Sequence, residues 1–124
     1  MRILLIDDEP IILACWSRLL ARAGHTVITS GNGKQGLAEF HRGNFDLIIV
    51  DQLLPDGPEG GEVISNVRES NNVPIIWITG HFDEWGKMEQ QVTSLTNVWL
   101  LLKPFMFADL LQVLAIIEAQ TACS

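Results

Sequence analysis

Four short stretches of the sequence carry side chains that together suit phosphoryl transfer. Each one follows or closes an apolar run; they are Asp7-Asp8-Glu9, Asp51, Thr79 and Lys103. Carboxylates that lie close together repel one another, and Mg²⁺, which prefers oxygen ligands, removes that cost. A carboxylate is also a covalent nucleophile toward phosphorus, and a nearby ammonium group neutralises charge. If the fold gathers these groups, we expect a metal-assisted phosphoryl-transfer site.

Each of these residues taken alone also has a plain structural explanation. Acids after a strand form solvated loops or helix caps, and a single Asp commonly starts a turn. Threonine is a frequent strand residue, and a lysine before a proline marks the end of a strand. The functional interpretation therefore depends on whether one fold brings all four stretches together.

The apolar runs predict five strands. They are rich in Ile, Val and Leu and mostly lack the alternation of a half-exposed strand, which indicates cover on both faces. The predicted strands are Ile3–Ile6, Val27–Thr29, Leu47–Val50, Val73–Thr79 and Val98–Leu102.

Helical patterns fill the intervals between the strands. Pro10 opens the first helix and Gly24 ends it, while Asn32 caps the second and Gly43 ends it. The remaining helices are expected at Glu62–Glu69, Asp83–Leu95 and Phe107–Ala119. The apolar periodicity assigns two inward faces: Ile12, Cys15, Leu19 and Ala23 on the first helix, and Leu110, Leu111, Leu114 and Ile117 on the last.

Strand and helix alternate five times with short connections, which predicts an α/β fold with a parallel sheet between two helical layers. Ligands of such sheets bind beyond the carboxyl ends of the strands. The acids, Thr79 and Lys103 all lie at those ends, so we expect them to converge on one rim.

The composition argues against a membrane-spanning protein and against a nucleic-acid-binding protein. The 124 residues suit one domain, residues 1–124, and no apolar run is long enough for a membrane span. With a net charge of −7 and 8 unclustered Lys and Arg residues, direct binding to nucleic acid is not expected. Met1 is interpreted as a cytoplasmic start, and Cys15 and Cys123 as free thiols in a reducing compartment.

Over nearly its whole length the chain resembles a response-regulator receiver domain. The matching pieces, in this order, are Asp7-Asp8-Glu9, Asp51 after Asp46–Val50, Pro55, Thr79-Gly80 and Lys103-Pro104-Phe105. The resemblance implies a flavodoxin-like, doubly wound (βα)5 fold with a five-stranded parallel sheet. It also implies a signalling protein that assists its own phosphorylation rather than an enzyme.

The same resemblance implies a metal site. Mg²⁺ would be bound by the side chains of Asp8 and Asp51, by the backbone carbonyl of Leu53, and through water by Asp7. Asp51 would also be the phosphoacceptor.

The resemblance further implies roles around the phosphoryl group. Thr79 would hydrogen-bond that group, and Lys103 would pair with one of its oxygens, with a cis peptide bond between Lys103 and Pro104. The donor would be a sensor histidine kinase or a histidine phosphotransfer protein, and phosphorylation would switch binding to a downstream protein target.

Several positions depart from the family pattern. Leu100 stands where an aromatic switch residue is common, so either Trp99 takes that role after a register shift or the switch is absent; a core or interface tryptophan is the plainer explanation. The loop 52–61 is long, with three glycines and a second proline. His81 stands where phosphoryl lifetime is influenced, and Met106 where a polar helix cap is common.

Three other functions remain compatible with parts of the pattern. A degenerate receiver would keep the fold and bind a partner without phosphorylation. A small phosphatase or a haloacid-dehalogenase-like phosphotransferase would also use an aspartyl nucleophile and Mg²⁺, but usually needs a longer chain. Flavin binding is less compatible, because the first loop is acidic and lacks a phosphate cradle.

Overall fold

Five strands and four helices make up the part of the chain that the computed structural model describes, which is residues 1–80, 88, 90, 95–103 and 107–122. The strands are β1 (Arg2–Ile6), β2 (Thr26–Ser30), β3 (Leu47–Asp51), β4 (Ile75–Thr79) and β5 (Val98–Leu102). The helices are α1 (Pro10–Arg22), α2 (Gly33–Arg42), α3 (Gly60–Arg68) and α5 (Phe107–Ala122). All five predicted strands are confirmed, with ends that differ by two residues at most.

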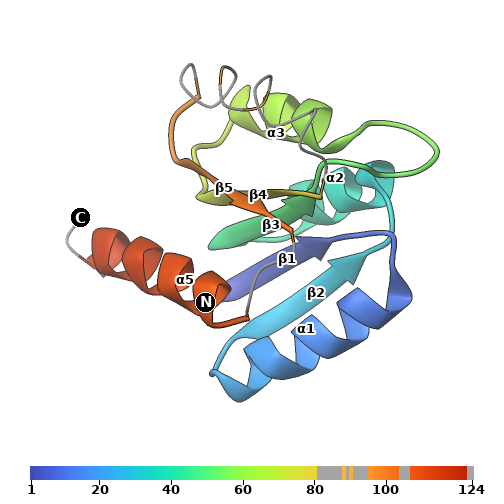
Figure 1. Ribbon diagram of the computed structural model, residues 1–124. Helices are drawn as coiled ribbons and strands as arrows, with labels where there is room; N and C mark the ends of the chain where they lie inside the picture. The colour runs from blue at the N-terminus through green and yellow to red at the C-terminus, as the bar shows by residue number, and fades with distance from the viewer. Residues whose placement is uncertain (81–87, 89, 91–94, 104–106, 123–124) are drawn as a thin grey trace.

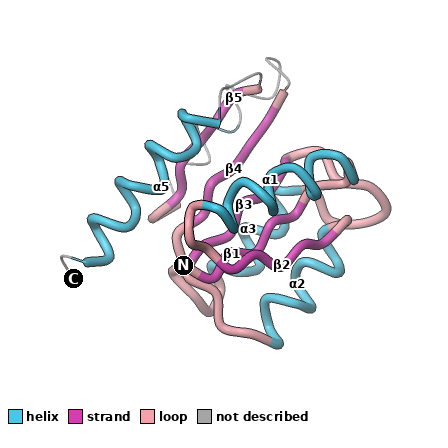
Figure 2. Tube along the Cα trace, turned by 90° about the horizontal axis from the view of Figure 1, so that it is seen from below, coloured by secondary structure: helices cyan, strands magenta, loops and turns pink. Residues whose placement is uncertain are grey.

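The strands form one parallel sheet, as the alternating pattern predicts, in the order β2-β1-β3-β4-β5. This order was not assigned from the sequence. Helices α1 and α5 lie on one face of this sheet, and α2 and α3 lie on the other (Figure 1). Figure 2 gives the arrangement in a view turned by 90°, with the strands in magenta and the helices in cyan. The doubly wound prediction is therefore confirmed.

Two hydrophobic cores, one on each face, hold the layers together. Alternate residues of each central strand enter opposite cores, so that Leu4 faces α2 and α3 while Leu5 faces α1 and α5. Every residue of β3 and β4 is buried. Burial on both faces explains why the central strands lack polar alternation.

Local sequence signals set where the helices begin and end. Pro10 occupies the first turn of α1, where its missing N–H costs no hydrogen bond. Gly24, just past the end of α1, has a φ of 97°, a conformation that glycine adopts without strain. The Asn32 side chain accepts a 2.8 Å hydrogen bond from the Gln35 backbone, which confirms the predicted cap of α2.

Two of the predicted helix faces are partly wrong. On α1, Cys15 and Ala23 are exposed, and the residue that is fully buried is Leu20. Leu13 and Trp16 pack beside Leu20 because they lie seven and four residues before it, on the same side of the helix. The sequence contains two overlapping apolar stripes, and periodicity alone does not choose between them.

The last helix shows a similar difference at one position. Leu110, Leu114 and Ile117 are buried as expected, whereas Leu111 is 38% exposed. Successive helical residues are rotated by about 100°, so Leu110 and Leu111 cannot both point at the sheet.

Some sequence expectations fall on residues outside the described part of the chain. These are most of the predicted helix Asp83–Leu95, and also His81, Pro104, Met106 and Cys123. Within the described part, no helix combines the length and the apolar character that crossing a membrane requires.

The start of α3 lies directly against the end of β3. A Cβ atom at Gly60 would be 2.5 Å from the Asp51 carbonyl oxygen and 2.8 Å from the Cα of Gln52. Both neighbours are backbone atoms, which cannot rotate away. Glycine at this position therefore sets how closely the third helix approaches the strand that ends in Asp51.

We predict that Gly60→Ala lowers the free energy of unfolding by about 1–3 kcal/mol, because the added methyl group overpacks this contact. Gly31→Ala is the matched control, since a Cβ there meets nothing within 4 Å. Denaturant unfolding of both variants and the parent measures the difference. Equal stability of the two variants would contradict the close approach.

Candidate functional site

Three carboxylates meet at the carboxyl edge of the sheet. Asp7 and Asp8 follow β1 and Asp51 ends β3, and one oxygen from each lies within 4.8 Å of the others. Asp7 and Asp51 are only 1% and 8% exposed, whereas Asp8 faces solvent. The structure thus brings together the three acids that were predicted from the sequence as metal ligands.

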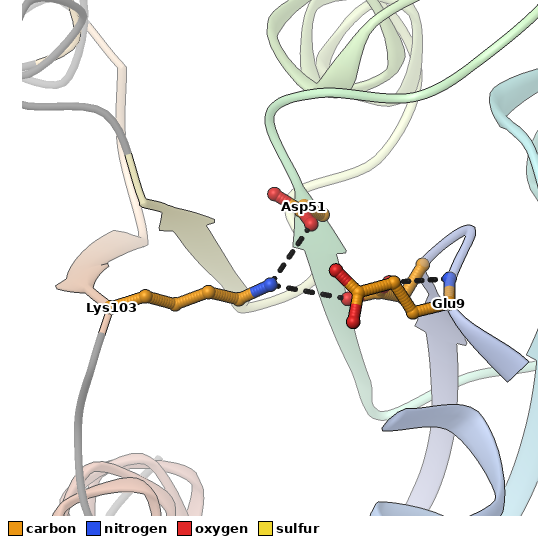
Figure 3. A network of polar contacts seen from close by, with 4 residues as sticks. Glu9, Asp51 and Lys103 are labelled. Atoms are coloured by element: carbon orange, nitrogen blue, oxygen red, sulfur yellow. Dashed lines mark hydrogen bonds and ion pairs between the residues drawn. The ribbon is translucent and has the colours of Figure 1, made fainter. Parts of the chain in front are cut away.

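Lys103, one residue beyond β5, reaches these acids from the other side. Its Nζ lies 3.1 Å from Asp51 Oδ2 and 3.7 Å from Asp7 Oδ2. Figure 3 shows its extended side chain pointing at Asp51, with Glu9 on the far side of the contact. The Glu9 backbone donates to Asp7 Oδ1 at 2.9 Å, which fixes the loop that carries the first two acids.

The electrostatics of Asp51 are dominated by burial. Burial raises the pKa of Asp51, Lys103 opposes this rise, and Asp7 adds to it, so that the pKa stays above the usual value. An isolated ion pair would have the opposite effect on an aspartate. The charged form of the Asp51 carboxylate is therefore less stable in this site than it would be in water.

Lys103 shows the complementary effect. Burial disfavours its charge, but Asp51 and Asp7, with a smaller effect from Glu9, outweigh burial and raise its pKa. The ammonium group thus stays protonated at neutral pH and balances part of the negative charge.

An open cavity of about 290 Å³ lies over these groups. Its lining consists of Asp8, Glu9, Asp51, Leu53, Gly80 and Lys103. Leu53, the predicted backbone ligand, is thus placed at the cavity, and its backbone N–H has a small lowering effect on the pKa of Asp51.

Thr79 ends β4, beside the strand that ends in Asp51, and is fully buried. Asp51 pairs with Ile78, so Thr79 lies one position further along the neighbouring strand. Its carbonyl accepts a 2.7 Å hydrogen bond from the backbone of Lys103. This bond ties together two of the predicted site residues.

The donor set fits a hard divalent cation. Carboxylate oxygens from Asp7, Asp8 and Asp51 converge, and Asp8 remains open to solvent, as a metal that keeps several of its waters requires. No thiol or imidazole belongs to this cluster in the described part of the chain, which disfavours a zinc-type site.

Leu100 and Trp99 enter opposite cores. Strand β5 pairs with β4 without a slip, from Ile75 opposite Val98 to Thr79 opposite Leu102. Leu100 packs toward α2 and α3, and Trp99 packs toward α1 and α5. Trp99 therefore does not take the place of Leu100. Its side chain packs against the core on the α1–α5 face, in agreement with the interpretation of Trp99 as a core tryptophan.

One further feature beside the site was not predicted from the sequence. Gln52, directly after Asp51, is buried, and it accepts a hydrogen bond from the indole of Trp77. Polar residues after a strand usually face solvent, so the only available signal was that a buried tryptophan N–H needs a partner.

Comparison with known proteins supports this geometry. The family model described as "Response regulator receiver domain" matches residues 3–115. The chain is 37% identical over 82 residues to the transcriptional regulatory protein AfsQ1 of Streptomyces coelicolor, covering 66% of this chain and 36% of that protein. It is 33% identical over 114 residues to the transcriptional regulatory protein CusR of Escherichia coli, covering 90% of this chain and 48% of CusR. The chain thus spans less than half of either relative.

Solved structures agree with the sequence matches. The response regulator TrrA of Thermotoga maritima, solved in complex with Mg²⁺-BeF, superposes with a TM-score of 0.81 at 29% identity, over 94% of this chain and 97% of that one. The chemotaxis response regulator CheY4 of Vibrio cholerae gives a TM-score of 0.81 at 30% identity, with the same coverage. With this fold, this cluster of acids and a family match over most of its length, the chain belongs to the response regulator receiver domain family.

Proposed function

We propose that this receiver domain accepts a phosphoryl group on Asp51 in a Mg²⁺-dependent reaction. The observation that carries the proposal is the contact of Lys103 Nζ with Asp51 Oδ2 at 3.1 Å, beside three carboxylates within 4.8 Å of one another. Nucleophile, cation ligands and counter-charge are thus already within reach of one phosphoryl group.

The metal would be held by the side chains of Asp8 and Asp51, by the Leu53 carbonyl, and through water by Asp7. When bound, Mg²⁺ would neutralise the acids and polarise the phosphoryl oxygens. The support from this chain is the converging oxygen set, and Mg²⁺-BeF in the TrrA structure shows that a similar protein binds such a group.

The reaction itself is a displacement at phosphorus. One carboxylate oxygen of Asp51 forms a bond to phosphorus while the P–N bond of a phosphohistidine donor breaks and its electron pair stays on the imidazole. Lys103 accompanies the charge that develops on the phosphoryl oxygens, and the Thr79 hydroxyl donates a hydrogen bond to one of them.

The partners follow from this chemistry. The donor would be a sensor histidine kinase or a histidine phosphotransfer protein, and the phosphorylated domain would bind a downstream protein target in the cytoplasm. Charge-assisted hydrogen bonds of the new phosphoryl group would favour one of two conformations. We further propose that residues 1–124 act as one signalling domain and turn over no separate substrate.

The second candidate is a degenerate receiver that binds its target without phosphorylation. The observation that favours it is Leu100, which faces the α2–α3 core where related proteins commonly have an aromatic switch residue. This departure concerns the transmission of the signal and leaves the acids and Lys103 intact, so phosphoacceptance remains the better-supported function.

We predict that incubation with Mg²⁺ and acetyl phosphate adds the mass of one phosphoryl group to the parent and none to Asp51→Asn. Asp56→Asn, an exposed acid in the following loop, is the matched control and should be modified like the parent. Intact-protein mass spectrometry distinguishes the three proteins. A folded parent that gains no mass from acetyl phosphate or from a phosphorylated kinase would favour the degenerate receiver.

We predict that Lys103→Met lowers the maximal phosphorylation rate by about 10²-fold, the usual effect of losing one group that stabilises developing charge. The Mg²⁺ concentration for half-maximal rate should not rise, because the variant removes a cation that competes for the same acids. Lys34→Met, at an exposed lysine, should resemble the parent. A normal rate in Lys103→Met would remove Lys103 from the mechanism.

The raised pKa of Asp51 predicts how pH affects stability. Because the folded-state pKa lies above the usual value, Asp51 stabilises the metal-free fold at low pH and loses this contribution as pH rises. The gain in melting temperature on adding Mg²⁺ should therefore be larger at about pH 8 than at about pH 5, where protons compete with the metal. Thermal unfolding with and without Mg²⁺ measures it, and equal gains at both pH values would refute it.

A further inference from the structure

The residue between the nucleophile and the proposed backbone ligand has a buried side chain that the proposed mechanism does not use. Gln52 is 8% exposed, and its Oε1 accepts two hydrogen bonds, from Trp77 Nε1 at 2.9 Å and from the Gly61 backbone at 3.0 Å. Its Nε2 donates a longer bond of 3.4 Å to Glu59 Oε2. We refer to Gln52, Trp77 and Gly61 with their two short bonds as the Gln52 bridge.

The backbone of Gln52 is held from the same two directions. Its N–H donates to the Ile78 carbonyl in β4 at 2.8 Å, and its carbonyl accepts from the Gly60 N–H at 2.9 Å. A helix leaves its first N–H groups without partners inside the helix. Gln52 supplies acceptors for two of them in α3, one from its backbone and one from its side chain.

Trp77 depends on this arrangement as much as Gln52 does. Its side chain is fully buried in the core under α3, and an indole N–H buried without a partner would cost free energy. A Cβ on Gly60 would lie 2.9 Å from Trp77 Nε1, so the start of the helix packs tightly over the indole. The indole, the amide and the helix start therefore fix one another's positions.

The bridge stands at the beginning of a loop whose middle has positive φ angles and few neighbouring atoms. Further along, Asp56 and Gly57 have φ values of 54° and 148°, and a Cβ on Gly57 would meet nothing within 4 Å. Leu53, between the bridge and this part of the loop, is 38% exposed and lines the cavity over Asp51. Leu53 thus lies between two buried residues: Leu54 holds its C-terminal side through apolar packing, and Gln52 holds its N-terminal side through hydrogen bonds.

We propose that Gln52 and Trp77 are positioning residues for the metal site: the Gln52 bridge orients the loop so that the Leu53 backbone is held at the Asp51 carboxylate. The inference rests on the proposed function, since it assigns a role in the Mg²⁺ affinity of that same site. Neither residue touches the reacting atoms. Both act through the Gln52–Leu53 peptide, and Leu53 lines the cavity over Asp51.

The amide group is what the bridge requires. Methionine has a similar length and shape, but it offers no comparable acceptor to the Trp77 and Gly61 N–H groups. Gln52→Met would therefore keep most of the packing and release the orientation of the loop. Residues that orient metal ligands typically change metal affinity by about 10- to 100-fold when they are replaced.

The test combines two measurements: the Mg²⁺ dissociation constant from titration calorimetry without a phosphodonor, and the initial rate of phosphorylation by acetyl phosphate as a function of Mg²⁺ concentration, followed by intact-protein mass. The dissociation constant should change together with the half-saturating concentration. In Gln52→Met we expect the half-saturating Mg²⁺ concentration to rise about tenfold, while the maximal rate changes by less than about threefold. For Lys103→Met we expect the reverse: a lower maximal rate and no rise in the half-saturating Mg²⁺ concentration. The matched control is Gln112→Met, the same change at an exposed position of α5.

Two further variants separate positioning from a loss of stability. Ile117→Val weakens the core on the opposite face of the sheet and should leave the half-saturating Mg²⁺ concentration unchanged. Trp77→Phe removes the indole donor, and because both residues act through one bond, the double variant with Gln52→Met should need no more Mg²⁺ than the worse single variant.

The possible outcomes distinguish failure of the positioning role from failure of the proposed phosphoacceptor function. A competent parent whose half-saturating Mg²⁺ concentration is unchanged in Gln52→Met, or is raised equally in Ile117→Val, overturns the positioning role alone. A folded parent whose modification by acetyl phosphate or a phosphorylated kinase needs no Mg²⁺, or does not occur, overturns the proposed function and the inference with it.

Discussion

The cost of burying carboxylates that repel one another is the constraint that the rest of the structure has to meet. Asp7 and Asp51 are almost completely buried and share one small space with Asp8, an arrangement that water would not hold together. Hydrogen bonding between strands that are buried on both faces keeps the acids in place. Lys103 lowers the pKa of Asp51, but burial, with a smaller contribution from Asp7, outweighs it and keeps the pKa above its usual value. A divalent cation bound among these oxygens would relieve the remaining cost of burying their charge.

The parallel sheet and the meeting of the acids could be predicted from the sequence because each depends on a strong local signal. Short Ile-, Val- and Leu-rich runs identified the strands, and the position of each polar residue at a strand end placed it on the common rim. Parallel topology then left little freedom, since all carboxyl ends must lie on the same edge. Asp51 and Lys103, 52 positions apart, are neighbours for this reason alone.

Details that depend on packing between elements could not be predicted in the same way. The buried face of α1 was wrongly assigned to the stripe of Ile12, Cys15, Leu19 and Ala23, three of which are exposed. Two apolar stripes overlap, and only the docked helix selects the one with Leu20. The contact between Gln52 and Trp77 joins residues 25 positions apart, with no spacing that a helix or strand would produce. It became visible only when β4 was placed beside β3 and α3 above both.

That contact also limits how the chain can change over generations. With an indole at position 77, an apolar residue at position 52 leaves a buried N–H without a partner. With an amide at 52, loss of the indole removes one of the two hydrogen bonds that the amide oxygen accepts. The first replacement at either site is therefore costly, and a compensating second replacement is much less so. Positions 52 and 77 should thus change together among related sequences. We expect either an amide with an indole or two apolar residues, and few sequences with a mixed combination.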